Sequence, residues 1–293
     1  MTAKQNPWKT YQEMEPEYRA LATAPESTVL DFGCWLPTLG RVVRPRVPGE
    51  MVLGTAQTGV GKTGFIDNLA FSTQQESLTF QQELPLTQVF ERGVAMATDT
   101  AACDIERLYR DGTPPSGFSY DALGHMHVCT ESGLTIERIE KLIHLAKESM
   151  IVPPVVVYVD YAGLMRSSGG SKYEQMSKIA QGLKRLAKDC EVVMMVNAQV
   201  ARKAPELGPE IHLYDAKDSG ELENSAQLVL GFWRDSDDST IMWIKVCKNN
   251  KGKSGFIVGA RFNGRTMRIT PMSGGEIEKL ASNGNEWAER CSV

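Results

Sequence analysis

Hydrophobic and polar positions alternate between two patterns from about residue 29 to residue 270: short β-branched runs and longer stretches with helical spacing. In residues 136–146 and 176–187 the apolar side chains recur every three or four positions, which predicts two amphipathic helices. An apolar run follows each of them, at 155–160 and at 192–197. We expect these runs to be neighbouring core strands joined by crossovers. The pattern predicts an α/β fold with a mostly parallel central sheet flanked by helices.

The two ends of the chain differ from this middle part. Residues 1–28 are polar and mixed, with a short helix expected around Pro16–Thr23, and are too few to fold alone. We interpret them as an extension or linker. Residues 29–273 should form the folded domain, and residues 274–293 a C-terminal tail.

Composition narrows the class of protein. The chain has 293 residues, 42% of them hydrophobic and 23% charged, as in ordinary globular domains. Its apolar runs are far shorter than the roughly 20 residues of a membrane span, and no apolar secretory signal opens it, so we expect a cytoplasmic protein without a membrane partner. Six cysteines without CxxC spacing argue against a disulfide framework or a zinc ribbon. The net charge of -4 leaves any nucleic-acid contact to a local patch or an oligomer's channel.

The segment AQTGVGKT, which follows one apolar run and precedes a helix-compatible stretch, predicts a phosphate loop for ATP. Gly59 and Gly61 would let backbone amides face a polyphosphate, and Lys62 would reach its β and γ phosphates. Thr63 would ligate Mg²⁺. A glycine turn with an incidental lysine is the weaker alternative. The predicted nucleotide-binding residues are Ala56, Gln57, Thr58, Gly59, Val60, Gly61, Lys62 and Thr63.

Three further polar residues stand at the ends of apolar runs. Asp160 would hold Mg²⁺ opposite Thr63, the alternative being an N-cap of the following turn. Glu83 follows a strand-like stretch that should pair beside the strand ahead of the phosphate loop, so its carboxylate would orient the attacking water. Gln199 would sense the γ phosphate, although by spacing alone a polar strand end is the better interpretation.

These four elements, in this order, resemble the motor domain of DnaB-type hexameric replicative DNA helicases over roughly residues 32–269. The segments LTFQQELP, DYAGLM and DAKDSGELENSAQLVLGFWRD carry the resemblance, the last through Ser219, Gly220 and Glu223. The resemblance implies a RecA-like ATPase that acts as a DNA helicase or translocase in replication, in the 5′-to-3′ direction. It also implies a homohexameric ring with nucleotide sites between subunits and single-stranded DNA in the channel, with a primase or helicase loader as partner.

By the same resemblance, two loops would face DNA: residues 166–172, RSSGGSK, and residues 202–213. Glycines allow close approach and basic side chains supply charge, which suits phosphate contact, whereas the alternative for the first loop is a solvated flexible segment. The candidate DNA-binding residues are Arg166, Gly169, Gly170, Lys172, Arg202 and Lys203.

Two departures from the family pattern leave a second function open. Where the family has a trans-acting Lys-x-Arg finger, this chain has Lys248, Asn249, Asn250 and Lys251. Lys248 or Lys251 would act from the neighbouring subunit, but without the bidentate fork of an arginine. The alternatives are slow hydrolysis or a finger supplied from elsewhere. The family's helical N-terminal domain is also not found here. The alternative is a nucleotide-gated DNA-binding or regulatory ATPase that oligomerises but does not unwind, and a phage or plasmid source suits either function.

Two other groups of residues are better explained by structure than by chemistry. His125, His127 and Cys129 share one face of a possible strand, which would suit a metal, but an edge strand without a metal is the better interpretation. Trp233 and Trp243 lie in or beside apolar runs, so we expect them to pack in the core rather than stack on bases.

Overall fold

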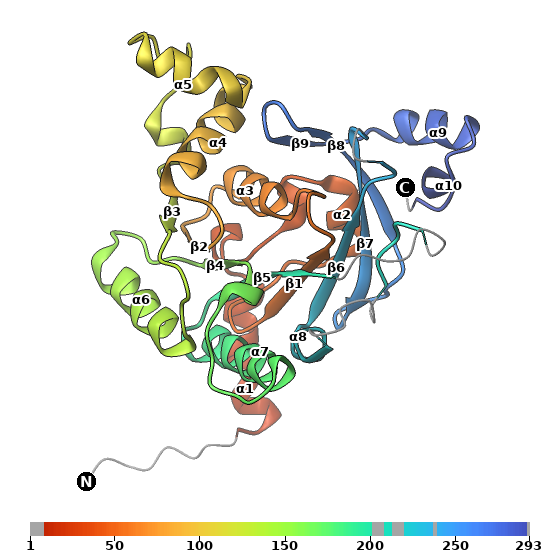
Figure 1. The fold of residues 1–293 in the computed structure, drawn as a ribbon. Helices are drawn as coiled ribbons and strands as arrows, with labels where there is room; N and C mark the ends of the chain where they lie inside the picture. Colours follow the sequence, from red (N-terminus) through yellow and green to blue (C-terminus); the bar gives the residue numbers. More distant parts are fainter. Residues whose placement is uncertain (1–8, 201–207, 213–219, 237–238, 292–293) are drawn as a thin grey trace.

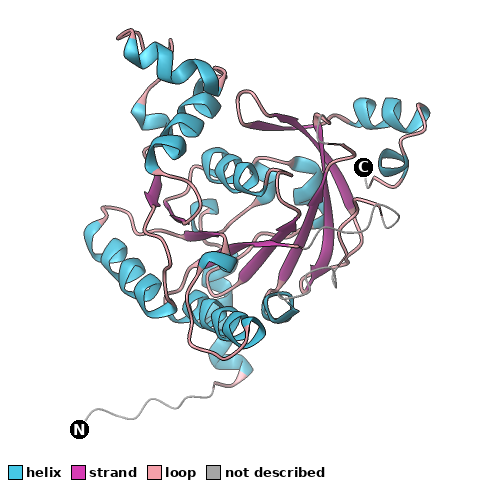
Figure 2. Ribbon diagram, in the orientation of Figure 1, coloured by secondary structure: helices cyan, strands magenta, loops and turns pink. Residues whose placement is uncertain are grey.

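A computed structural model describes residues 9–200, 208–212, 220–236 and 239–291. One nine-stranded sheet crosses this part of the molecule in the order β3-β2-β4-β5-β1-β6-β7-β8-β9 (Figures 1 and 2). Its strands are β1 (Met51–Ala56), β2 (Ser77–Gln81), β3 (Met126–Cys129), β4 (Val156–Asp160), β5 (Val193–Gln199), β6 (Leu228–Trp233), β7 (Ile241–Asn249), β8 (Ile257–Asn263) and β9 (Arg268–Pro271). The strands from β3 to β6 pair in parallel, and those from β6 to β9 pair antiparallel.

Helices cover both faces of the parallel part (Figure 2). The α-helices are α1 (Tyr11–Ala22), α2 (Pro37–Val42), α3 (Lys62–Thr73), α4 (Leu86–Thr98), α5 (Ala102–Arg110), α6 (Ile136–Ser149), α7 (Lys172–Asp189), α8 (Gly220–Ser225), α9 (Gly274–Ser282) and α10 (Glu286–Glu289). The apolar faces of α6 and α7 form one core layer with the sheet. Helices α2 and α3 form the other layer on the opposite face. The α/β fold and both predicted amphipathic helices are confirmed.

The predicted core strands lie where the hydrophobic pattern requires. β4 and β5 pair in parallel, and β4 is buried over its whole length. A continuous apolar run needs cover on both faces, which the two helical layers provide. The prediction that the strand before Glu83 lies beside the phosphate-loop strand is wrong, because β2 pairs with β3 and β4, and two strands separate it from β1.

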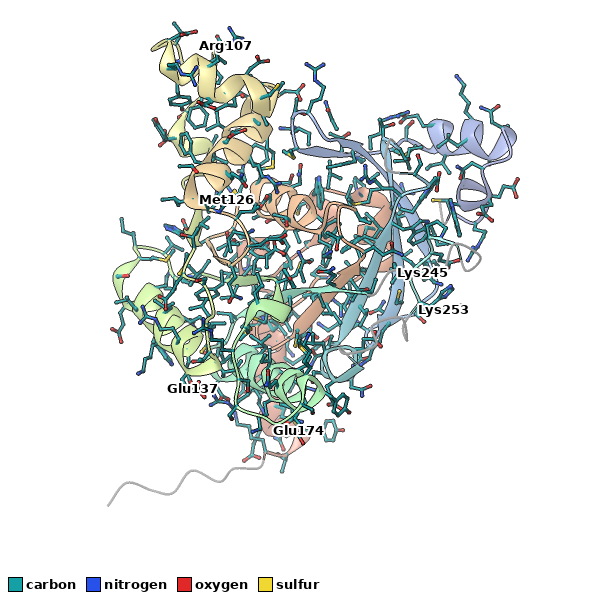
Figure 3. The ribbon with its side chains drawn as sticks, viewed as in Figure 1. Arg107, Met126, Glu137, Glu174, Lys245 and Lys253 are labelled. Atoms are coloured by element: carbon teal, nitrogen blue, oxygen red, sulfur yellow. The ribbon has the colours of Figure 1, made fainter. Side chains whose placement is uncertain are left out.

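The two lateral ends of the sheet carry separate additions. Between β2 and β3 the chain makes α4 and α5, which project from the body with Arg107 near their outer end (Figure 3). Beyond β9, the segment expected to be a tail forms α9 and α10, and Ile277 and Trp287 pack there against Trp233 and Trp243. The core packing predicted for these two tryptophans is confirmed, with exposed fractions of 1% and 0%.

The N-terminal segment and β3 complete the described chain. Helix α1 is longer than expected and none of its residues is buried. Among the described strands β3 pairs only with β2, so the prediction that this segment is an edge strand is confirmed. His125 bonds the Ala70 carbonyl and His127 bonds Glu76. Among the residues that the structure describes, no group of three or more His, Cys, Asp or Glu side chains could hold a metal ion.

Candidate nucleotide site

The phosphate loop leaves the carboxyl end of β1 and runs into the N-terminus of α3. Gly59 and Gly61 have φ values of 82° and 115°, which side chains other than glycine rarely adopt. A Cβ on Gly61 would also lie 2.8 Å from Cε of Met242. Thr58 and Gly59 are exposed at the loop's tip. The loop therefore has the backbone freedom and the open face that polyphosphate binding requires.

The Lys62 side chain folds back over this loop. Its ammonium donates hydrogen bonds to the carbonyls of Ala56 (3.2 Å) and Gln57 (3.0 Å). Burial lowers the pKa of Lys62, while the negative charges of Asp160 and Glu83 act in the opposite direction. The cation is thus held at the loop by weak neutral acceptors, which phosphate oxygens can replace.

Asp160 lies at the end of β4, 1% exposed, and three neighbours donate hydrogen bonds to its carboxylate. The Thr63 hydroxyl donates to Oδ2 at 2.6 Å, and the side-chain amides of Gln81 and Asn197 donate to Oδ2 and Oδ1 at 2.9 Å each. The following turn begins at Tyr161 without a side-chain cap, so the N-cap alternative for Asp160 is wrong. A buried carboxylate beside a hydroxyl is the oxygen pair that Mg²⁺ prefers, and the residues fit that ion.

Glu83 stands two residues beyond the end of β2, exposed, on the same side of the site. Its negative charge opposes the lowering of the Lys62 pKa. The Gln81 amide oxygen accepts the backbone N–H groups of Glu83 (3.0 Å) and Leu84 (3.3 Å). Gln81 therefore connects the Asp160 carboxylate to the backbone that carries Glu83, a role that no spacing pattern indicated.

Gln199 occupies the exposed end of β5, directly beside β1. Its side-chain amide donates a hydrogen bond to the Thr58 hydroxyl at the tip of the loop. The structure thus brings Gln199 to the tip of the phosphate loop. A γ-phosphate sensor remains a prediction.

Asp67 is a further carboxylate close to the site. It lies on α3, one turn beyond Thr63. Burial raises its pKa to about 7, the negative charge of Asp160 adds to the effect, and Arg92 opposes it. No sequence motif marks this residue, because its pKa depends on what the fold packs around it.

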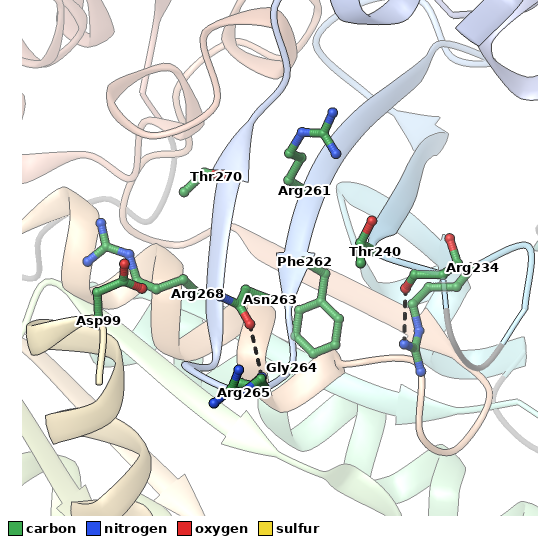
Figure 4. A pocket seen from close by; sticks show the side chains of 11 residues that line it. Asp99, Arg234, Thr240, Arg261, Phe262, Asn263, Gly264, Arg265, Arg268 and Thr270 are labelled. Atoms are coloured by element: carbon green, nitrogen blue, oxygen red, sulfur yellow. Dashed lines mark hydrogen bonds between the residues drawn. The ribbon is translucent and has the colours of Figure 1, made fainter. Parts of the chain in front are cut away.

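A pocket of about 800 Å³ adjoins the phosphate loop (Figure 4). Arg234 lies at its edge and donates to the Gly59 carbonyl at 2.8 Å, with its guanidinium 5.3 Å from the centre of the Phe262 ring. Arg261, Arg265 and Arg268 also line the pocket, and Asp99 is the one acidic residue among its described lining residues. A flat ring and a flat cation beside a phosphate loop can stack a base, and the surplus of arginines favours an anionic ligand.

The two lysines expected to reach a neighbouring copy are both engaged within their own chain. Lys248 donates to the carbonyls of Glu223 (2.8 Å) and Asn224 (3.2 Å), and Lys251 pairs with Glu50 at 3.0 Å. Both lie at the opposite end of the strands from the loop of their own chain: Leu228, at the start of β6, pairs with Asn249, whereas Phe232, near its end, pairs with Ala56. They cannot reach the nucleotide of their own copy.

The first expected DNA loop begins at Arg166, which is exposed, as are Gly169, Gly170 and Lys172. Together with α6 and α7 it borders a pocket of about 470 Å³, where Arg166, Lys178 and Arg185 provide positive charge. Charge of this kind at an open surface suits a nucleic-acid backbone. Arg202 and Lys203, from the second expected loop, lie outside the described residues.

This fold and this site define a RecA-like P-loop ATPase domain. The family model for the DnaB-like helicase C-terminal domain matches residues 36–271, and the chain belongs to that family. The probable plasmid replicative DNA helicase of Chlamydia trachomatis serovar L2 is 27% identical over 217 residues, 70% of this chain and 47% of the relative. The replicative DNA helicase DnaB of Haemophilus influenzae is 25% identical over 246 residues, 76% of this chain and 51% of the relative.

Solved structures agree on the fold. The ATPase domain of the protein called G40P has a TM-score of 0.77 at 19% identity and covers 92% of this chain and all of its own. A DnaB-like replicative helicase studied with primase gives 0.75 at 20% identity and covers 90% of this chain and 69% of its own. The chain spans about half the length of the curated relatives it matches. None of its described helices is long and apolar enough to cross a membrane.

Proposed function

We propose that this chain is the motor of an ATP-driven DNA helicase, which moves 5′-to-3′ along single-stranded DNA during replication in the cytoplasm. The observation that carries the proposal is the arrangement of Thr63, Asp160 and Lys62: a hydroxyl 2.6 Å from a buried carboxylate, beside a cation folded over a phosphate loop. Membership of the DnaB-like family and relatives named as replicative helicases support the choice of DNA as the polymer.

The nucleotide would be ATP with Mg²⁺. Its phosphates would bind the amides of the loop and the Lys62 ammonium, and its base would lie against the paired side chains of Arg234 and Phe262. The Thr63 hydroxyl and the Asp160 carboxylate would hold Mg²⁺, which when bound neutralises negative charge on the phosphates. Gln81 and Asn197 keep the Asp160 carboxylate oriented throughout, because each donates to it at 2.9 Å.

Hydrolysis would begin with a water molecule held by the Glu83 carboxylate. The carboxylate accepts a proton from this water as the water oxygen attacks the γ phosphorus. The bond between that phosphorus and the bridging oxygen breaks, and ADP leaves with the charge that Lys62 stabilises. Gln199, already bonded to Thr58 at the loop, would lose its γ-phosphate contact on product release. That loss is the local signal that hydrolysis has taken place.

The working form would be a ring of six copies with nucleotide sites between subunits. Lys248 and Lys251 lie at the opposite end of the strands from their own phosphate loop, which is the geometry of residues that act on the next copy. Helix α1 supports self-association, because Tyr11 and Tyr18 are 91% and 66% exposed on a helix without a buried residue. Single-stranded DNA would pass the loop that begins at Arg166, and a primase or a helicase loader would be a further partner.

An unwinding assay on a forked duplex, run beside ATPase measurements with and without single-stranded DNA, tests this function. We expect ATP-dependent strand separation and a faster ATPase with DNA, both abolished in Lys62→Ala. Hydrolysis that DNA stimulates without any strand separation would replace the helicase by a DNA-binding ATPase that does not unwind. Failure to bind Mg-ATP in the assembled protein would remove the proposal altogether.

A further inference from the structure

Gln82 lies between Gln81, which binds Asp160, and Glu83, the proposed base. Its side chain contacts a different part of the molecule. Whereas Gln81 reaches Asp160 on the nucleotide side, Gln82 is 8% exposed and its amide oxygen accepts the backbone N–H of Leu134 at 3.1 Å. The backbone N–H of Gln82 donates to the Asp160 carbonyl at 2.9 Å. The main chain of Gln82 is therefore bonded to the end of the strand that carries Asp160, and its side chain is bonded to the segment ahead of α6.

Leu134 in turn holds the first residue of the expected DNA loop. Its carbonyl accepts the backbone N–H of Arg166 at 2.9 Å, and its side chain is 1% exposed within the core layer of α6 and α7. The Arg166 guanidinium lies against Gly133, where an added Cβ would be 2.6 Å from Nε. Gln82 thus holds the peptide unit that precedes the Leu134 side chain, and Arg166 holds the peptide unit that follows it.

The Gln82 amide is only half satisfied. Its oxygen has the Leu134 partner, but Nε2 is buried and has no hydrogen-bond partner among the described residues. A buried, unpaired donor is costly, so an arrangement that gives Nε2 a partner would gain free energy at this amide. A second position of the Gln82 side chain that gives Nε2 a partner would meet the requirement that coupling between two sites has for two states.

We propose that Gln82 is a positioning residue that couples single-stranded DNA at residues 166–172 to the catalytic carboxylate of Glu83. This inference rests on the proposed function. A strand drawn toward Arg166 shifts its backbone, the shift passes through the Leu134 peptide to the Gln82 side chain, and one peptide bond links Gln82 to Glu83. Because coupling is reciprocal for binding free energies, the nucleotide state changes the affinity for DNA by the same route.

Substitution of Gln82 separates the relay from the site itself. Gln82→Met keeps the length of the side chain and removes its acceptor, whereas Gln82→Glu keeps an acceptor for the Leu134 N–H. We expect Gln82→Met to retain basal ATPase and to lose DNA stimulation by about fivefold or more, and Gln82→Glu to retain most of it. Gln88→Met, an exposed glutamine on α4, is the matched control and should match the unaltered protein.

A double-mutant cycle with Arg166→Ala adds a readout that a merely structural role would not move. If Gln82 acts through Arg166, DNA should stimulate the ATPase of the double variant as much as that of the more impaired single variant. If the two residues act independently, the fold losses of the two single variants should multiply in the double variant. Full stimulation in Gln82→Met, or multiplied losses in the cycle, would overturn the relay and leave the proposed function standing. A wild-type ATPase that DNA does not stimulate would overturn both.

Hydrogen exchange on the unaltered protein keeps the inference testable if Gln82→Met fails to fold. With a non-hydrolysable ATP analogue present, adding oligothymidylate should change the exchange rate of the Leu134 amide, whose acceptor is Gln82. An unchanged rate at saturating DNA would overturn the relay, while DNA binding in the same sample would show that the site at residues 166–172 remains intact.

Discussion

Replacing Gln81 by methionine tests whether this one amide holds Asp160 and the backbone of Glu83 in position. Gln81 is 2% exposed, donates to Asp160 at 2.9 Å and accepts from the backbone of Glu83 at 3.0 Å. Methionine fills nearly the same volume and makes only weak hydrogen bonds. Gln81→Met therefore removes the link between the two carboxylates without opening a large cavity.

The size of the effect follows from which groups lose a partner. A hydrogen bond to a charged group contributes about 1.5–3 kcal/mol, so unfolding should become easier by ~2 kcal/mol. The Glu83 N–H lies at an exposed residue, where water can take the place of the amide oxygen, and adds little. The phosphate loop is untouched, so nucleotide binding persists. Turnover should fall by roughly 10-fold to 100-fold, because a displacement of about 1 Å at a reacting group has that effect.

Steady-state ATPase measurements separate kcat from KM, and thermal unfolding reports the stability of the same preparations. The expected pattern for Gln81→Met is a lower kcat, a KM within about threefold of the original, and a lower Tm. The surface variant Gln88→Met should change none of the three. A kcat that survives while Tm falls would show that Gln81 only stabilises the fold, and the positioning argument would be refuted.

Three other changes test the remaining parts of the site. Glu83→Gln should keep Mg-ATP binding, seen in filter binding, and lose turnover by about 10²-fold or more; normal turnover would reject Glu83 as the base. Asn250→Arg should raise the ATPase of the assembled protein by at least ~10-fold, and an unchanged rate would show that position 250 does not face the neighbouring nucleotide. Because burial raises the pKa of Asp67 from 3.8 to about 7, the folded state binds a proton that the unfolded state lacks, so this residue's contribution to stability is lost as pH rises between those values. Asp67→Asn should flatten that part of the curve in denaturant titrations from pH 4 to pH 8, and parallel curves would refute the assignment.

The parts of the molecule that sequence predicts well are those set by local pattern. The phosphate loop needs glycines at two positive-φ positions and a lysine and a threonine at fixed distances from them, and all four stand within five residues. β4 and β5 follow amphipathic helices and each begins with a run of apolar residues, so burial of these runs on both faces could be predicted before the structure.

Strand order and long-range polar contacts could not be predicted in this way. Adjacent positions in sequence do not require adjacent places in a crossover-built sheet, which is why β2 was wrongly expected beside β1. Arg234 meets the Gly59 carbonyl across 175 residues, and Gln81 meets Asp160 across 79. An arginine or glutamine at a strand end has no spacing signature, so only the folded chain shows which one enters the site.

The finger residues illustrate a limit that belongs to a single copy of the chain. The sequence alone suggests that Lys248 and Lys251 are available to a neighbouring copy. In the structure each is bonded within its own chain, and the exposed residue between them is Asn250. Recruiting either lysine for a neighbouring phosphate would first break those contacts, which costs free energy that an exposed arginine at position 250 would not.

Catalysis by this chain should therefore depend on how copies meet. The phosphate loop follows the carboxyl end of β1, and residues 248–251 lie beside the amino end of β6. A copy that offers the surface around residues 248–251 to the phosphate loop of the next copy therefore makes a head-to-tail contact. Such contacts close into rings when the rotation allows and otherwise form filaments. Since the same contact would complete every nucleotide site, ATPase activity per chain should rise with protein concentration, and a rate per chain that stays constant through the assembly transition would mean that each site is already complete within one copy.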